Sequence, residues 1–209
     1  MPKFPKIVKF ALIFLATYLI LVIAAQATGF RQGFAASFAK WATATYRDYI
    51  PGTEASFQPS TKAKEYDMVI TMINVNTRAA KMDAARKAGL EQVNLDVGSS
   101  NFSVWDYFLL QFIVLFSLVL ATPVPWKQKG ISFLLGGTVL LLFTFHRFHC
   151  SLKYYALESP VLEPSGISPF CEKYVRAVFS MQSIEFIFIS TFIIWALATF
   201  GKSGLAGNG

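Results

Sequence analysis

The sequence predicts a membrane α-helical fold with four transmembrane helices and a small extracytoplasmic α+β domain between helices 1 and 2. The chain is 54% hydrophobic and 16% aromatic, and its mean hydropathy is +0.47. Its apolar residues run in long stretches without the periodic polar positions of a soluble helix. About 20 such residues are needed to cross the hydrocarbon core. A segment of mixed polarity separates the first stretch from the second.

Residues 1–30 form the first predicted transmembrane helix. Lys3, Lys6 and Lys9 precede or open it. A signal peptide has the same layout, but its apolar core is usually about 7–15 residues long, shorter than this one. We therefore expect a retained anchor. Cleavage after an Ala-x-Ala-like site at residues 25–27 is the alternative.

Residues 31–50 are predicted to be an amphipathic helix. Phe34, Phe38 and Trp41 are spaced by three or four positions, which puts them on one face. An aromatic face of this kind can lie in the membrane interface. The alternative is that it packs on the protein's own domain or bundle. Pro and Gly at positions 51 and 52 end the helix.

Residues 51–103 are predicted to form the α+β domain. Strands are expected at Glu54–Ser60, Tyr66–Asn76 and Gln92–Val97, and a short helix at Arg78–Ala88. Three strands and a helix can just bury a small core. Pairing with a sheet edge of another protein is an alternative source of stability.

The rest of the chain supplies the other three helices. They are expected at residues 104–122, 131–148 and 178–200, with an extracytoplasmic loop at 149–177 and a disordered tail at 201–209. Gly136 and Gly137 in the third helix could allow close helix contact.

Charge predicts the orientation. The short segments at both termini and between helices 2 and 3 are purely basic: they hold Lys3, Lys6, Lys9, Lys127, Lys129 and Lys202 and no acidic residue. Short basic segments stay in the cytoplasm, whereas long translocated domains follow the rule poorly. Both termini are therefore predicted to be cytoplasmic and the domain extracytoplasmic. This topology explains much of the net charge of +7 without nucleic-acid binding.

Cys150 and Cys171 are the only cysteines, and both fall in the predicted outer loop. An oxidising exterior lets such a pair persist as a disulfide. We therefore predict a disulfide between them. Two unrelated thiols are the alternative.

Glu185 is expected inside helix 4, where an ionisable residue is costly unless it is paired or hydrated. Arg147, at the outer end of helix 3, is its predicted partner in an intramembrane polar pair. An ion or proton path through Glu185 and Gln182 is the alternative. A metal site at His146, His149 and Cys150 is disfavoured, because no acidic residue lies beside them. No metal, cofactor or catalytic residue is predicted, since no nucleophile, phosphate-binding or zinc-protease motif occurs.

Two short motifs support a family resemblance. The run Asp-Tyr-Phe-Leu-Leu-Gln at 106–111 opens the second helix, and Ala-Thr-Pro at 121–123 closes it. Over residues 90–200 the layout resembles the small membrane proteins encoded with exosortases. The resemblance implies an accessory role beside a membrane-embedded sorting enzyme of the bacterial envelope, in the inner membrane. The catalytic Cys, Arg and His of exosortases have no matching positions here.

The function predicted from the sequence is therefore a non-enzymatic accessory or scaffold subunit of an envelope complex. Its outer domain would dock on another membrane or envelope protein, and its helices would contact membrane lipid. A homo-oligomer is left open. The alternative is a subunit of a transporter or channel that uses Glu185 in a polar path, and a membrane enzyme is the least supported class.

Overall fold

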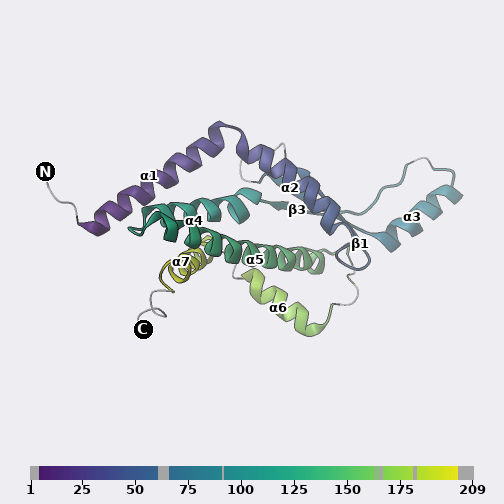
Figure 1. Cartoon of the computed structure of the whole chain (residues 1–209). Helices are drawn as coiled ribbons and strands as arrows, with labels where there is room; N and C mark the ends of the chain where they lie inside the picture. The colour runs from purple at the N-terminus through teal and green to yellow at the C-terminus, as the bar shows by residue number, and fades with distance from the viewer. Residues whose placement is uncertain are drawn as a thin grey trace. The chain divides into compact units, whose positions relative to one another are not determined.

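The computed structural model describes residues 5–60, 66–90, 92–162, 164, 167–180 and 183–201. It is mostly helical with one small sheet (Figure 1). The chain divides into two compact units. The helical unit comprises Met1–Arg31, Trp105–His146 and Met181–Gly209. The sheet unit comprises Gln32–Val104 and Arg147–Ser180.

Apolar helices make up the helical unit. They are α1 (Lys6–Ala27), a π-helical turn η1 (Trp105–Leu109) that continues as α4 (Leu110–Ala121), the first part of α5 (Trp126–Glu158), and α7 (Ile184–Phe200). Helix α4 packs on both α1 and α7. Pro123 and Pro125 separate α4 from α5, because proline cannot continue a helix.

A small core holds the helical unit together. Leu115, Val119 and Leu140 are buried at its centre. A Cβ atom added at Gly136 would lie 3.4 Å from the Cβ of Ala198 and 3.4 Å from a methyl group of Leu115. The absence of a side chain at Gly136 therefore lets α4, α5 and α7 approach closely, as expected from the sequence.

The helices of this unit alternate in direction. Gln128, near the start of α5, donates a 2.9 Å hydrogen bond to the carbonyl of Thr199, near the end of α7. Lys129 donates to the carbonyl of Leu120, near the end of α4. The beginnings of α1 and α5 and the ends of α4 and α7 thus lie together. We call this the basic end, defined by Lys6, Lys9, Lys127 and Lys129.

The outer surface of the helical unit is apolar. Helix α1 has no buried residue, although it packs on α4. Two helices, α1 and α5, are long and apolar enough to cross a membrane, and α6 with α7 makes a third candidate if the broken pair is one span. The most exposed large apolar side chains of the unit include Ile7, Ile20, Ile23, Leu134, Leu142 and Leu197.

The sheet unit contains a three-stranded antiparallel sheet. Strand β1 (Thr53–Pro59) pairs with β2 (Met68–Asn74), and β2 pairs with β3 (Gly98–Phe102). Alternate residues of β2 are buried, as its β-branched and apolar pattern predicts. The helices of this unit are most of α2 (Phe30–Tyr46), α3 (Val75–Lys87), the last part of α5, and α6 (Pro169–Ser180).

Phe148 of α5 is at the centre of the sheet unit's core and is fully buried. Its ring lies 5.4 Å from the rings of Phe38 and Tyr46, and 5.3 Å from that of Phe102. Edge-to-face contacts of this kind add to the stabilisation from apolar burial. Two segments distant in the sequence, α2 and β3, therefore pack on one side chain of α5.

Polar contacts fix the edges of this unit. The carboxylate of Glu54 on β1 accepts hydrogen bonds from Arg47, which follows α2, and from Arg78, which lies near the start of α3. Asp67, just before β2, accepts a 2.6 Å hydrogen bond from the backbone N–H of Val104, just after β3. Asn74 caps α3 by accepting from two backbone N–H groups.

The third strand predicted at Gln92–Val97 is wrong, because the structure has no regular element there. Strand β3 lies at Gly98–Phe102 instead. Phe102 pairs with Met68 and is 3% exposed, whereas Val97 is 41% exposed. Burial of the aromatic side chain thus decides which residues pair. The second strand also ends at Asn74 rather than Asn76, because that residue caps the following helix.

The predicted loop at 149–177 is largely helical. Helix α5 continues to Glu158, and α6 begins at Pro169. The extension is favoured because Leu152 and Ala156 are buried in the sheet unit. Helix α7 begins at Ile184, where the Ser183 side chain caps it, rather than at residue 178. The predictions that concern Lys3, Gln182 and residues 202–209 fall outside the described residues.

Candidate binding pocket

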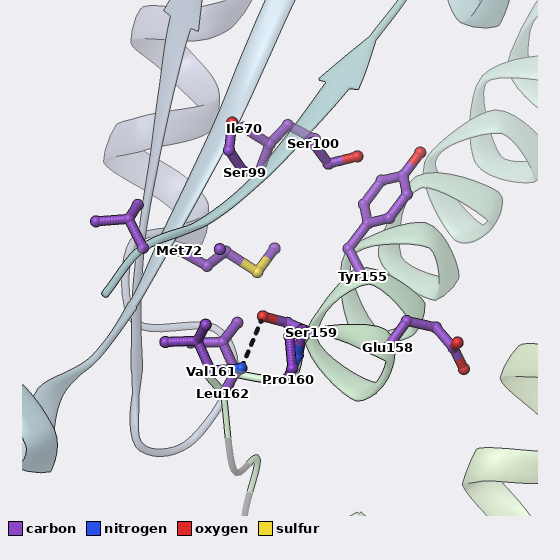
Figure 2. A pocket seen from close by; sticks show the side chains of 12 residues that line it. Ile70, Met72, Ser99, Ser100, Tyr155, Glu158, Ser159, Pro160, Val161 and Leu162 are labelled. Atoms are coloured by element: carbon purple, nitrogen blue, oxygen red, sulfur yellow. Dashed lines mark hydrogen bonds between the residues drawn. The ribbon is translucent and has the colours of Figure 1, made fainter. Parts of the chain in front are cut away.

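A cavity of about 320 Å³ lies within the sheet unit, between the sheet and the end of α5. Figure 2 shows Ser100 and Tyr155 toward one end of the cavity and the segment 159–162 toward the other. Met72 lies between these ends. The remaining lining residues are Ile70, Val97, Gly98, Ser99 and Glu158. The cavity is thus apolar inside, with hydroxyl groups around it.

Sheet register and a close backbone approach shape this cavity. Ile70 and Met72 are buried on one face of β2 and are paired with Ser100 and Gly98 of β3. A Cβ at Gly98 would lie 2.8 Å from the hydroxyl oxygen of Ser159, so a side chain there would require the Ser159 side chain to move. The backbone N–H of Val161 also donates to that hydroxyl over 3.4 Å. Gly98 therefore allows the Ser159 side chain to approach β3 closely at this end of the cavity.

The polar groups of the cavity are hydrogen-bonding groups. Burial raises the pKa of the Tyr155 phenol, while its hydrogen bond with Ser100 lowers it. The phenol, whose ordinary pKa of 10.0 is already well above neutral pH, therefore stays protonated and can donate a hydrogen bond. Glu158 pairs with Arg176 of α6, and both side chains are over 40% exposed. The Glu158 carboxylate is therefore exposed to solvent and already paired with Arg176.

Among the described residues around the cavity there is no His or Cys. The ionisable side chains that line it are Tyr155 and Glu158, and Glu158 is paired with Arg176. Groups of three metal-ligating side chains are also not found in the described part of the chain. The chemistry that the cavity supports is reversible binding of an apolar group flanked by hydrogen-bonding atoms.

The predicted disulfide is not formed, since the structure keeps Cys150 and Cys171 as thiols. Cys150 is buried inside α5, and Cys171 lies in the first turn of α6, so each thiol is held on a helix and not in the loop that the sequence predicted. Burial raises the pKa of the Cys150 thiol, Lys153 lowers it and Cys171 raises it. A buried thiol of raised pKa is a poor nucleophile.

The predicted pair of Glu185 and Arg147 is divided between the two units. Glu185 lies in the exposed first turn of α7 in the helical unit, not one or two turns inside a helix. A carboxylate there interacts favourably with the helix dipole. Arg147 is 1% exposed and belongs to the sheet unit. Their pairing stays a prediction.

The aromatic face of α2 is oriented partly inward. Phe38 is buried against Phe148, and Phe34 is half-buried, with its ring 6.3 Å from that of Phe38. Trp41 keeps 41% of its surface exposed. Phe38 thus packs on the protein's own domain, which is one of the two alternatives that the sequence left open. Trp41 is partly exposed at the surface.

Sequence reasoning missed the cavity altogether. Its lining comes from β2, β3 and the end of α5, and none of Ser99, Ser100 or Tyr155 belongs to a recognisable motif. The helical pattern that continues past residue 148 is the one signal that could have placed Tyr155 on a helix.

Comparisons with protein-family models, with curated proteins and with solved structures find no match to this chain.

Proposed function

We propose that this chain is a non-enzymatic integral membrane protein that anchors a docking domain at the outer face of the bilayer. The helical unit crosses the membrane four times, and the sheet unit lies outside the cytoplasm. There it binds another protein of the envelope through the cavity beside β3. The observation that carries the proposal is an apolar cavity beside β3 with hydroxyl-bearing side chains in its lining.

The dimensions of the helices support four spans. Helix α1 is about 33 Å long at 1.5 Å per residue, close to the roughly 30 Å of the hydrocarbon core. Residues 126–146 of α5 match it at about 32 Å. The paths through η1 with α4 and through α7 are shorter, about 25 Å each, and suit a locally thinned bilayer.

The alternation of helix direction supports the same topology. The beginnings of α1 and α5 and the ends of α4 and α7 share the basic end, as four antiparallel spans require. The acidic residues of the helical unit, Asp106 and Glu185, lie in the first turns of η1 and α7, at the other helix ends. A basic end without carboxylates is typical of the cytoplasmic side.

The surface of the helical unit supports burial in lipid. Ile7 is 75% exposed, Leu134 73% and Leu197 67%. Soluble monomers rarely expose contiguous apolar surface on this scale. In lipid the same side chains are matched by acyl chains, and every backbone group of the helices is satisfied internally.

Cysteine-accessibility labelling tests the topology. Both native cysteines are first replaced by Ser, and single Cys reporters are placed at Ser60 and Lys127. An impermeant maleimide added to intact cells should label the first reporter and leave the second unlabelled until the membrane is opened. Labelling of both from outside contradicts four spans.

Site-specific photo-crosslinking tests docking. A benzophenone amino acid at Ser99, beside the cavity, should give a discrete adduct with a second protein in native membranes. The same probe at Met82, exposed on α3, is the control and should give none. Ser100→Phe, which fills the cavity, should remove the adduct while circular dichroism stays unchanged. Equal adducts from Ser99 and Met82, or an adduct that survives Ser100→Phe, would refute docking at this cavity.

A further inference from the structure

A second cavity, of about 400 Å³, lies at the basic end of the helical unit. It is lined by Lys6 and Lys9 of α1, by residues 120–123 at the end of α4, and by Lys129 of α5. Among the described residues that line it, none is acidic. Three lysine side chains therefore line one hollow, and none of its described lining residues carries a carboxylate.

Crowded like charges favour a bound anion. Ammonium groups on one hollow repel one another, and an anion between them converts that repulsion into attraction. Lys129 is partly engaged, because it donates to the carbonyl of Leu120. It still has two other N–H donors. Lys6 and Lys9, which also line the hollow, are exposed to solvent.

The remainder of the wall is apolar. Phe10, Ile13 and Leu120 line the cavity beside the lysines, and the exposed apolar surface of α1 continues from it through Leu12 and Ile20. A small inorganic anion gains nothing from such a wall. A phospholipid fits both parts, since its phosphate can contact the ammonium groups while its acyl chains lie along α1.

Trp126 places this end at the depth of lipid headgroups. It opens α5 and is 77% exposed. The ammonium of Lys129 lies 4.9 Å from the centre of its ring. Exposed tryptophan beside lysine is the usual composition of a membrane–water interface.

We propose that the hollow at the basic end is a binding site for the phosphate of an anionic phospholipid, held by Lys6, Lys9 and Lys129. The inference rests on the proposed membrane location of the helical unit. The inference goes beyond the membrane location because it names a specific ligand. General attraction to an anionic membrane surface would depend on the number of lysines and not on which lysines are present. Lys127 lies on the same helix as Lys129 and is exposed, but it does not line the hollow.

Thermal unfolding of the full-length protein, purified in a neutral detergent and stripped of lipid, tests the site. Phosphatidylglycerol should raise the Tm by about 5 °C or more at saturation. Phosphatidylcholine with the same acyl chains should leave the Tm unchanged. The double variant Lys6→Gln, Lys9→Gln should lose the shift, and Lys127→Gln should retain it.

Three results would overturn the proposal. They are equal shifts with both lipids, equal loss of the shift in Lys127→Gln, and the same shift with millimolar inorganic phosphate alone, which would assign the hollow to a small anion. Native mass spectrometry of retained phosphatidylglycerol gives a second readout if the double variant is itself less stable. Alkaline carbonate extraction of wild-type membranes separates the two proposals. A protein that stays in the membrane but shows no lipid preference contradicts the lipid site alone.

Discussion

A leucine at position 136 tests the packing of the helical unit most directly. The Cβ of any side chain there would lie 3.4 Å from Ala198 and 3.4 Å from Leu115. Leu115 is fully buried and Ala198 is 9% exposed, so neither neighbour has room to move away. The three further carbons of leucine must therefore separate α5 from α4 or α7.

The expected cost follows from overpacking in other buried sites, which is about 1–3 kcal/mol. In a chain of this size each kcal/mol lowers the Tm by about 2–4 °C. Gly136→Leu should therefore unfold roughly 2–12 °C below the wild type. Gly130→Leu is the matched control in the same helix, because a Cβ there has nothing within 4 Å. Its Tm should stay level or rise, since leucine favours helix over glycine.

Circular dichroism at 222 nm during heating, with all three proteins in the same detergent, measures this difference. Comparison at one heating rate is required, because membrane proteins often unfold irreversibly. Equal Tm values for Gly136→Leu and the wild type would refute the close approach of α4, α5 and α7. An equal fall in Gly130→Leu would assign the effect to glycine replacement in general.

The other predictions concern charges and thiols. Hydrogen bonding from its arginine partners holds the pKa of Glu54 below its usual 4.5. The charged form of Glu54 therefore stabilises the fold fully above pH 4.5, and this stabilisation is lost as the pH falls through the lower pKa of the folded state. Glu54→Gln should consequently reduce the loss of Tm between pH 5 and 3. Cys150 should react with maleimide at neutral pH more slowly than Cys171, because it is buried and its pKa is raised; equal rates would contradict its burial. If Glu185 and Arg147 pair, Glu185→Gln and Arg147→Gln should each lower the Tm and the double variant should lose less than the sum; strict additivity argues against the pair.

Periodicity alone predicted the elements whose burial follows one simple pattern. Helix α1 is apolar all round, and β2 alternates strictly between buried and half-buried positions. Both lie close to their predicted ranges. The predicted helix at 78–88 overlaps most of α3 but begins three residues too late. Asn74 caps α3, so the helix begins at Val75 and the preceding strand ends two residues earlier than predicted.

Tertiary burial decided the elements that the sequence misplaced. Val93, Leu95 and Val97 alternate like a strand, yet the pairing falls on Gly98–Phe102, whose residues are mostly small and polar. One buried ring, Phe102, outweighs the better local pattern. The continuation of α5 past residue 148 was missed for a similar reason, because its polar residues look like a loop until the buried face at Leu152 is known.

The two cavities were beyond sequence reasoning for a geometric reason. Each is lined by segments that are distant in the chain, so no local spacing could identify it. The lysines of the basic end were recognised one by one as topology signals. Their convergence on one hollow depends on the packing of α1 on α4 and on the contact of Lys129 with the end of α4.

The discontinuity of the sheet unit has a consequence for synthesis of the protein. Its three strands end at Phe102, but Phe148, on which their core depends, follows only after the segment 105–146 has been made. At about 5–20 residues per second the ribosome needs several seconds for that segment. During this delay the strands present open edges and unburied aromatic rings, which is a state prone to aggregation. The sheet unit can therefore complete its core only after the apolar helices of residues 105–146 have been synthesised, and under the proposed topology this order couples its folding to membrane insertion.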